Sequence, residues 1–139
     1  MELDRALDFA AQYKTATLIT LRRDGRPQSS DIAYDVSDGV IRISVTDDRA
    51  KTHNMRRDER VVLHVSKPDQ WSYVSLDGIV ELTEVTTEAG DATSRLLADQ
   101  YERVSGQPHP DWDEFFEAMI SERRLLALVR PTSAVGMLH

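Results

Sequence analysis

Residues 41–55 carry the pattern with the clearest chemistry in this sequence. A β-branched, apolar stretch ends in hydroxyl residues and runs into a short predicted helix, with Arg49 and Lys51 in its first turn. A helix N-terminus offers free main-chain N–H groups and a positive dipole end, so cations are unfavourable there unless an anion neutralises them. We expect either a phosphate site, with Arg49 as bidentate clamp, Lys51 as point charge and Thr52 as hydroxyl donor, or a solvated charged turn.

Side chains that could act as acid, base or nucleophile form no recognisable set. No nucleophile elbow, dinucleotide fingerprint or P-loop motif occurs, and the four histidines show no metal-ligand spacing with carboxylates. We expect Asp47 and Asp48 to cap the helix. Trp71 and Tyr73 alternate on one predicted strand and share a face, either packed in the core or as a wall for a flat ligand. An anion site without an acid or base fits chemistry supplied by a bound cofactor, so we expect no catalytic side chain and no metal.

Composition limits the class of protein. The 139 residues suit one domain, which we place at 1–139. The net charge of −7 argues against general nucleic-acid binding, which needs a basic face. The lack of cysteine excludes disulfides, thiolate nucleophiles and zinc–thiolate sites. No apolar run approaches the roughly 20 residues that cross a bilayer, so we expect no membrane partner and a cytoplasmic location.

The hydrophobic pattern predicts a mainly β chain with inserted helices. Apolar alternation predicts strands at 15–22, 27–36, 40–46, 60–66, 71–85, 125–130 and 134–138, the last two separated by Pro131. Helical spacing predicts helices at 2–13, 48–57, 88–104 and 111–122, the last capped by Asp111. Asp24-Gly25 and Asp38-Gly39 predict hairpin turns, Asp77-Gly78 a bulge and Pro27 an edge strand. We expect a six- to seven-stranded antiparallel barrel with helices.

Several motifs occur in a fixed order along the chain. They are Arg26-Pro27-Gln28-Ser29-Ser30 after a hairpin, the strand 41–46, Arg49-Ala50-Lys51-Thr52-x-Asn54, Asn54-Met55-Arg56-Arg57-Asp58, Trp71-Ser72-Tyr73, the strand 78–83, Asp111-Trp112 and Glu122-Arg123-Arg124. This order resembles the pyridoxamine 5'-phosphate oxidase-like split β-barrel superfamily over nearly the whole chain. The Arg-Ala-Lys-Thr and Trp-Ser-Tyr segments are most similar to its B-type flavin/deazaflavin oxidoreductases, which bind the deazaflavin coenzyme F420.

The resemblance implies a fold, an assembly and a cofactor site. It implies an FMN-binding split barrel that forms a homodimer, with Arg49 and Lys51 on the cofactor phosphate and Trp71 supplied by the partner subunit. The implied cofactor-binding residues are Pro27, Gln28, Ser29, Ser30, Asp31, Ser44, Val45, Thr46, Arg49, Ala50, Lys51, Thr52 and Trp71. Asp31 departs from the Asn of several relatives and would repel a ring carbonyl or reject anionic substrates. The Arg-Leu-x-Pro-type motif of true pyridoxamine phosphate oxidases is missing from 130–139, so vitamin B6 oxidation is not expected.

The resemblance therefore implies an F420H2-dependent reductase that passes a hydride to an electron-poor small molecule, with the proton from solvent. The alternatives are an FMN-dependent oxidoreductase of the same superfamily and a non-catalytic cofactor- or haem-binding protein. F420 carries a lactyl-oligoglutamate tail beyond its phosphate, whereas FMN ends there. Arg56, Arg57 and Arg60 either meet this tail or form a solvated helix end. We expect residues 107–113 and the helix around Glu88 to shape the substrate pocket.

Overall fold

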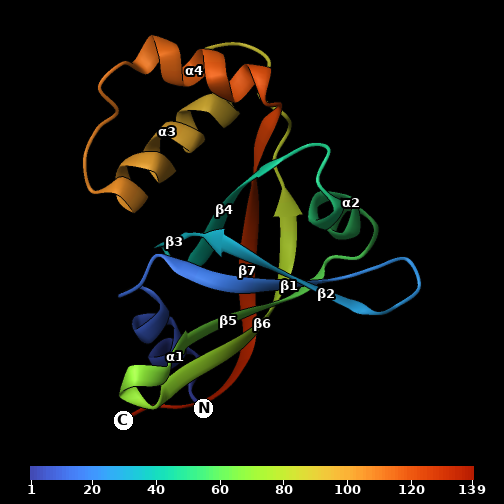
Figure 1. The fold of residues 1–139 in the computed structure, drawn as a ribbon, viewed down its shortest axis with the longest axis vertical. Helices are drawn as coiled ribbons and strands as arrows, with labels where there is room; N and C mark the ends of the chain where they lie inside the picture. Colours follow the sequence, from blue (N-terminus) through green and yellow to red (C-terminus); the bar gives the residue numbers. More distant parts are fainter.

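The computed structural model describes residues 1–139 and contains one seven-stranded antiparallel sheet (Figure 1). The strands are β1 (Thr15–Leu21), β2 (Pro27–Ala33), β3 (Asp35–Ser37), β4 (Val40–Thr46), β5 (Arg60–Lys67), β6 (Ser72–Leu82) and β7 (Arg124–Met137). Their order is β2-β1-β5-β6-β7-β4-β3, so β2 and β3 are the two edges. The predicted turns join β1 to β2 and β3 to β4, with Gly25 and Gly39 at positive φ, and Pro27 begins an edge strand as predicted.

Strands β6 and β7 form the long spine of the sheet and are irregular at Gly78. Their register shifts between Asp77 and Gly78, which confirms the predicted bulge. Glycine is needed there because a Cβ would lie 2.6 Å from Val129 Cγ1. The predicted interruption at Pro131 is wrong, since β7 is one continuous strand. Pro131 lies opposite Gly78 at the bulge, where a missing N–H is tolerated.

The sheet curls around the main core, a cluster of 20 buried residues, and forms the expected split barrel. Helix α1 (Leu3–Ala10) packs against β6 and β7, and its buried residues include Phe9 and Ala10. Strand β2 ends before Tyr34, earlier than predicted. Tyr34 is wholly buried, and its hydroxyl donates to the Ala10 carbonyl at 2.6 Å. Helix α2 (Ala50–Arg57) follows β4 and buries Met55 in the same core.

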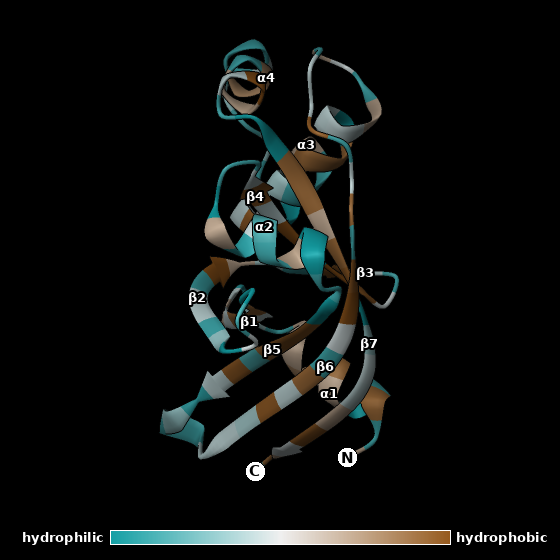
Figure 2. Ribbon diagram, turned by 90° about the vertical axis from the view of Figure 1, so that its right-hand side faces the viewer, coloured by the Kyte–Doolittle hydropathy of each residue, from teal (hydrophilic) through white to brown (hydrophobic).

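A helical hairpin stands at the end of the molecule opposite the two chain termini (Figures 1 and 2). It consists of α3 (Ala92–Ser105) and α4 (Trp112–Ser121), which pack around a second cluster of Leu97, Phe115 and Leu126. Helix α3 begins at Ala92 and not at 88, because Asp91 is its cap. The predicted Asp111 cap is confirmed, since its carboxylate accepts from Glu114 N at 3.2 Å. No helix of the structure has the length and apolar character needed to span a bilayer.

Candidate functional site

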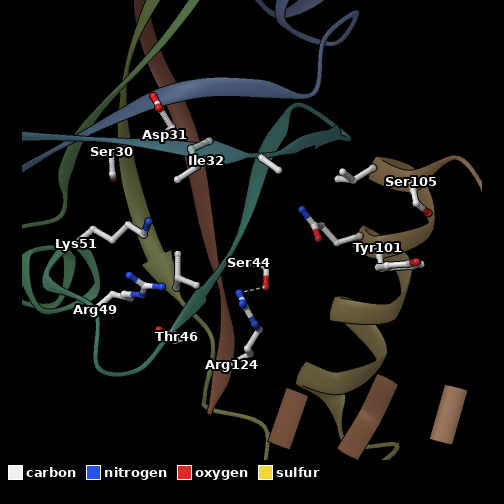
Figure 3. A pocket seen from close by; sticks show the side chains of 14 residues that line it. Ser30, Asp31, Ile32, Ser44, Thr46, Arg49, Lys51, Tyr101, Ser105 and Arg124 are labelled. Atoms are coloured by element: carbon white, nitrogen blue, oxygen red, sulfur yellow. Dashed lines mark hydrogen bonds between the residues drawn. The ribbon is translucent and has the colours of Figure 1, made fainter. Parts of the chain in front are cut away.

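A cavity of about 590 Å³ opens where the edge strand β2 approaches the end of β4 (Figure 3). The N-terminus of α2 and the start of β7 form its floor, and α3 forms its far wall. Its lining residues are Ser30, Asp31, Ile32, Ala33, Ser44, Val45, Thr46, Arg49, Lys51, Gln100, Tyr101, Val104, Ser105 and Arg124. A smaller recess of about 150 Å³ is lined by Gln28, Ser30, Arg49, Ala50 and Lys51. Nine of the cofactor-binding residues expected from the sequence therefore line this cavity or the smaller recess.

The turn before α2 leaves the helix N-terminus without an internal anion. The helix begins at Ala50, two residues later than predicted, and Arg49 is its N-cap, with no capping bond from the side chain. The expectation that Asp47 and Asp48 cap the helix is wrong. Asp47 binds Arg56 and Arg123, and these guanidinium groups hold the pKa of Asp47 below its usual range. The carboxylate of Asp48 instead accepts from the Thr46 hydroxyl at 2.9 Å.

Thr52 has a different place from the one expected. Its side chain is fully buried, and its hydroxyl donates to the Thr46 carbonyl at 2.7 Å. This buried hydrogen bond joins the first turn of α2 to the last residue of β4. Thr52 therefore fixes the position of Arg49 and Lys51 and does not present its hydroxyl to the cavity.

Three cations face this cavity. Neither Arg49 nor Lys51 belongs to any of the ion pairs of the structure. The third, Arg124, pairs with Glu122 at 2.9 Å and donates to Ser44 Oγ at 3.3 Å. Burial, followed by the charges of Arg49 and Arg124, lowers the pKa of Lys51 from its ordinary value. An anion bound here would relieve this repulsion, so the site fits a phosphate.

Strand β2 points alternate residues toward and away from the barrel interior. Gln28, Ser30 and Ile32 lie on the more buried face, whereas Pro27, Ser29 and Asp31 are more exposed. Figure 3 shows the Asp31 carboxylate turned away from Lys51 and Arg49, while Ser30 points toward them. Asp31 is nevertheless one of the residues that line the cavity, so its expected influence on a bound ring stays a prediction.

Trp71 lies outside the cavity of its own chain. It follows the short helix η1 (Pro68–Gln70), has a left-handed backbone with φ 52°, and is 81% exposed. The η1 turn lies near the two chain termini, at the opposite end of the molecule from α3 and α4 (Figure 1). The expectation that Trp71 and Tyr73 share one strand face is wrong, since β6 begins at Ser72 and does not include Trp71. The Tyr73 ring packs at a tilt against the His64 ring, with 5.4 Å between the ring centroids.

The far wall of the cavity comes from the helix predicted at 88–104, but from its C-terminal part and not from the region around Glu88. Gln100, Tyr101, Val104 and Ser105 of α3 line it, whereas neither Glu88 nor residues 107–113 do. Arg124 was also missed. Helical spacing groups Gln100 with Val104, but only the docking of α3 beside β4 shows that this face meets the cavity.

The additional cations considered for a cofactor tail are engaged within the chain. Arg56 binds Asp47, Arg57 donates to Asn54 Oδ1 at 2.8 Å, and Arg60 pairs with Asp58 at 2.8 Å. None of them lines the cavity. No cluster of three His, Asp or Glu side chains in the structure has a geometry that would hold a metal ion.

An open seven-stranded antiparallel barrel with a cavity at its split edge defines the split β-barrel class of proteins. The chain belongs to the pyridoxamine 5'-phosphate oxidase family, whose model matches residues 3–130. This membership confirms the superfamily and the fold expected from the sequence.

Solved structures agree with this assignment. A conserved hypothetical protein of Mycobacterium tuberculosis is 25% identical with a TM-score of 0.79, and the match covers 100% of this chain and 86% of that one. An F420 reductase is also 25% identical, with a TM-score of 0.64 over 88% of this chain and 89% of that chain. A heme binding protein from Mycobacterium smegmatis is 20% identical, with a TM-score of 0.71 over 97% of this chain and 53% of its own length, and shows the fold alone.

Proposed function

We propose that this protein binds the phosphate of a deazaflavin or flavin at the N-terminus of α2 and acts as an F420H2-dependent reductase. The observation that carries the proposal is the pair of unpartnered cations, Arg49 and Lys51, facing a cavity in a chain of net charge −7. The similarity to an F420 reductase supports the choice of cofactor.

The chain's own residues would bind and orient the cofactor. Arg49 and Lys51 would hold the phosphate, and Ser30 and Ser44 offer hydroxyls along the slit. When bound, reduced F420 supplies a hydride for an electron-poor double bond. The walls of β2 and α3 would exclude water and hold the acceptor close. No acidic side chain is assigned to the reaction, so the proton would come from solvent.

A parallel titration tests the choice of cofactor. The protein is titrated with F420 and with FMN at low and high ionic strength, with the fluorescence of each ring as readout. We expect tighter binding of F420, and weaker binding of both at high salt because the contacts are ionic. Equal or stronger binding of FMN would overturn the deazaflavin assignment, and binding of neither would overturn the proposed function as a whole.

A second candidate, an FMN-dependent oxidoreductase, is favoured by one observation. Arg56, Arg57 and Arg60 are bound to other groups of the chain, so they leave no free cluster of cations for an oligoglutamate tail. A ligand that ends at its phosphate needs no such cluster. A haem-binding role has less support, because none of the four histidines lines the cavity.

We also propose a symmetric homodimer. Trp71 is 81% exposed, and Val135 and Met137 are 63% and 51% exposed, which leaves apolar side chains uncovered in one chain. Light scattering would then give about 32 kDa, twice the 15.8 kDa of one chain. A monomer at micromolar concentration with the cofactor present would contradict the dimer and a partner-supplied Trp71.

A further inference from the structure

The carboxamide of Gln100 is buried and has one orientation. The residue is 6% exposed, and its Nε2 donates to the Arg42 carbonyl at 3.4 Å. Only the nitrogen of an amide side chain can donate to a carbonyl, so this bond fixes which way the group is turned. The oxygen, Oε1, is left free to accept.

The free oxygen of Gln100 is reached from the cavity. Every fully enclosed side-chain nitrogen or oxygen in the structure has a hydrogen-bond partner. The only bond of the Gln100 side chain is the one from its nitrogen, so Oε1 is not fully enclosed. The rest of the Gln100 side chain is buried, and the residue lines the cavity. The accessible acceptor Oε1 therefore faces the space that the ligand would fill.

The position of Gln100 is fixed from behind by Arg42, a buried residue of β4. The Arg42 guanidinium pairs with Asp35 at 2.6 Å and with Asp99 of α3 at 2.9 Å. Arg42 therefore contacts two successive residues of α3. Its side chain pairs with Asp99, and its main-chain carbonyl accepts from Gln100. Such support keeps an acceptor in place before a ligand arrives, which lowers the entropy lost on binding.

The cavity thus has two different ends. Arg49, Lys51 and Arg124 offer only donors, whereas Gln100 on the wall of α3 offers an acceptor. Val104 lies one turn further along the same helix and adds an apolar surface beside Gln100. This arrangement matches a ligand with an anionic group at one end and a flat ring with an N–H donor at the other.

We propose that Gln100 Oε1 accepts a hydrogen bond from the imide N–H of the bound ring, which makes Gln100 a specificity-determining residue. The proposal rests on the proposed function, since flavins and deazaflavins both carry this N–H at N3. A site that hydrogen-bonds a ligand N–H rejects an analogue without it, because the buried acceptor is then left unpaired.

Paired ligands that differ only at N3 test this assignment. The protein is titrated with FMN and with 8-hydroxy-5-deazariboflavin 5'-phosphate, each with and without a methyl group on N3. In the wild type we expect the methyl group to weaken binding about tenfold, the usual strength of one such bond. In Gln100→Leu the two forms should bind within twofold of each other. The exposed Glu102→Gln on the same helix is the control and should keep the tenfold difference.

Each outcome decides the proposal. Equal affinity for methylated and unmethylated rings in the wild type overturns it, and so does a methyl effect that persists in Gln100→Leu. If that variant does not fold, Gln100→Met replaces it, and exchange of the ¹⁵N-bound N3 proton in the wild-type complex gives an independent readout, with at least tenfold slowing expected. If neither parent ring binds, the proposed function fails; if a parent binds without a methyl effect, only the role of Gln100 fails.

Discussion

Two helices of this protein begin in opposite ways. Helix α2 begins behind Arg49, whose side chain makes no capping bond, and its first turn holds Lys51 and no acidic residue. Helix α3 begins behind Asp91, whose carboxylate accepts from the main-chain N–H of Thr87 at 2.9 Å and of Ser94 at 2.8 Å. The chain satisfies the N-terminus of α3 internally and leaves that of α2 open to an external anion.

The pKa values of the two sites show the same contrast. Burial alone would raise the pKa of Asp91, but hydrogen bonds from Thr87, Ser94 and other donors outweigh it and lower the value, so the charged form is favoured. Burial and neighbouring cations lower the pKa of Lys51, so there the charged form is disfavoured. We expect the first arrangement to stabilise the fold, and the second to cost stability that a bound anion would restore.

The largest effect is expected when the cations of α2 are removed. Arg49→Ala and Lys51→Ala should each weaken cofactor binding by about 1.5–3 kcal/mol, roughly 10- to 150-fold, because each deletes a charged hydrogen bond to phosphate. Arg49→Asp should weaken binding more than either alanine variant, since it places a carboxylate where we propose that the phosphate binds. Fluorescence titration measures the Kd, and the exposed Arg95→Ala of α3 is the control. Unchanged affinity in both alanine variants would refute the phosphate site.

The opposite result is expected at α3. Asp91→Ala should lower the free energy of unfolding by about 1–2 kcal/mol through loss of the cap, with little change in cofactor affinity. Urea denaturation measures the effect, and Asp91→Asn, which keeps an acceptor, should lose less. A variant as stable as the wild type would show that the cap does not hold this hairpin in place.

The effect of Asp91 on stability should also depend on pH. Its pKa is lower in the folded state than in the unfolded chain, so its contribution is present above the ordinary Asp pKa of about 3.9. That contribution is lost as the pH falls through the folded value. The difference between wild type and Asp91→Ala should therefore shrink in acid.

Local sequence signals predicted most of the fold. Asp24-Gly25 and Asp38-Gly39 specified hairpins, and the Asp111 cap was found, because each depends on neighbouring residues only. The break at Pro131 was predicted wrongly, since its tolerance depends on Gly78 in another strand. Such pairings between distant segments are not visible in one sequence.

In the candidate site, too, the residues of one local segment were predictable and those brought in from distant segments were not. Arg49 and Lys51 were recognised because they follow a strand within one segment. Arg124 and Gln100 were missed, since they join the cavity through β7 and α3 docked beside β4. The cap expected at Asp47 fails for a related reason, because Arg123, 76 residues further along the chain, competes for the Asp47 carboxylate. The carboxylate of Asp48 instead accepts from the neighbouring Thr46 hydroxyl.

The smallest effect is expected on the stability of the ligand-free protein. Lys51→Met removes a charge that is partly buried and repelled by Arg49 and Arg124, while it keeps a long apolar stem. We expect the free energy of unfolding to rise by about 0.5–1 kcal/mol, even though cofactor binding is weakened. The exposed Lys14→Met is the control and should change stability little.

The pH dependence of this gain separates charge repulsion from better packing. The folded pKa of Lys51 is below its ordinary value, so between the two values the unfolded chain binds more protons than the folded one. The stability of the wild type relative to Lys51→Met should therefore rise as the pH increases through this range, and the gap should close once Lys51 is neutral in both states. A gain that stays constant from neutral to alkaline pH would assign it to packing. In that case the open N-terminus of α2 would cost the fold nothing, and the contrast with α3 would concern binding alone.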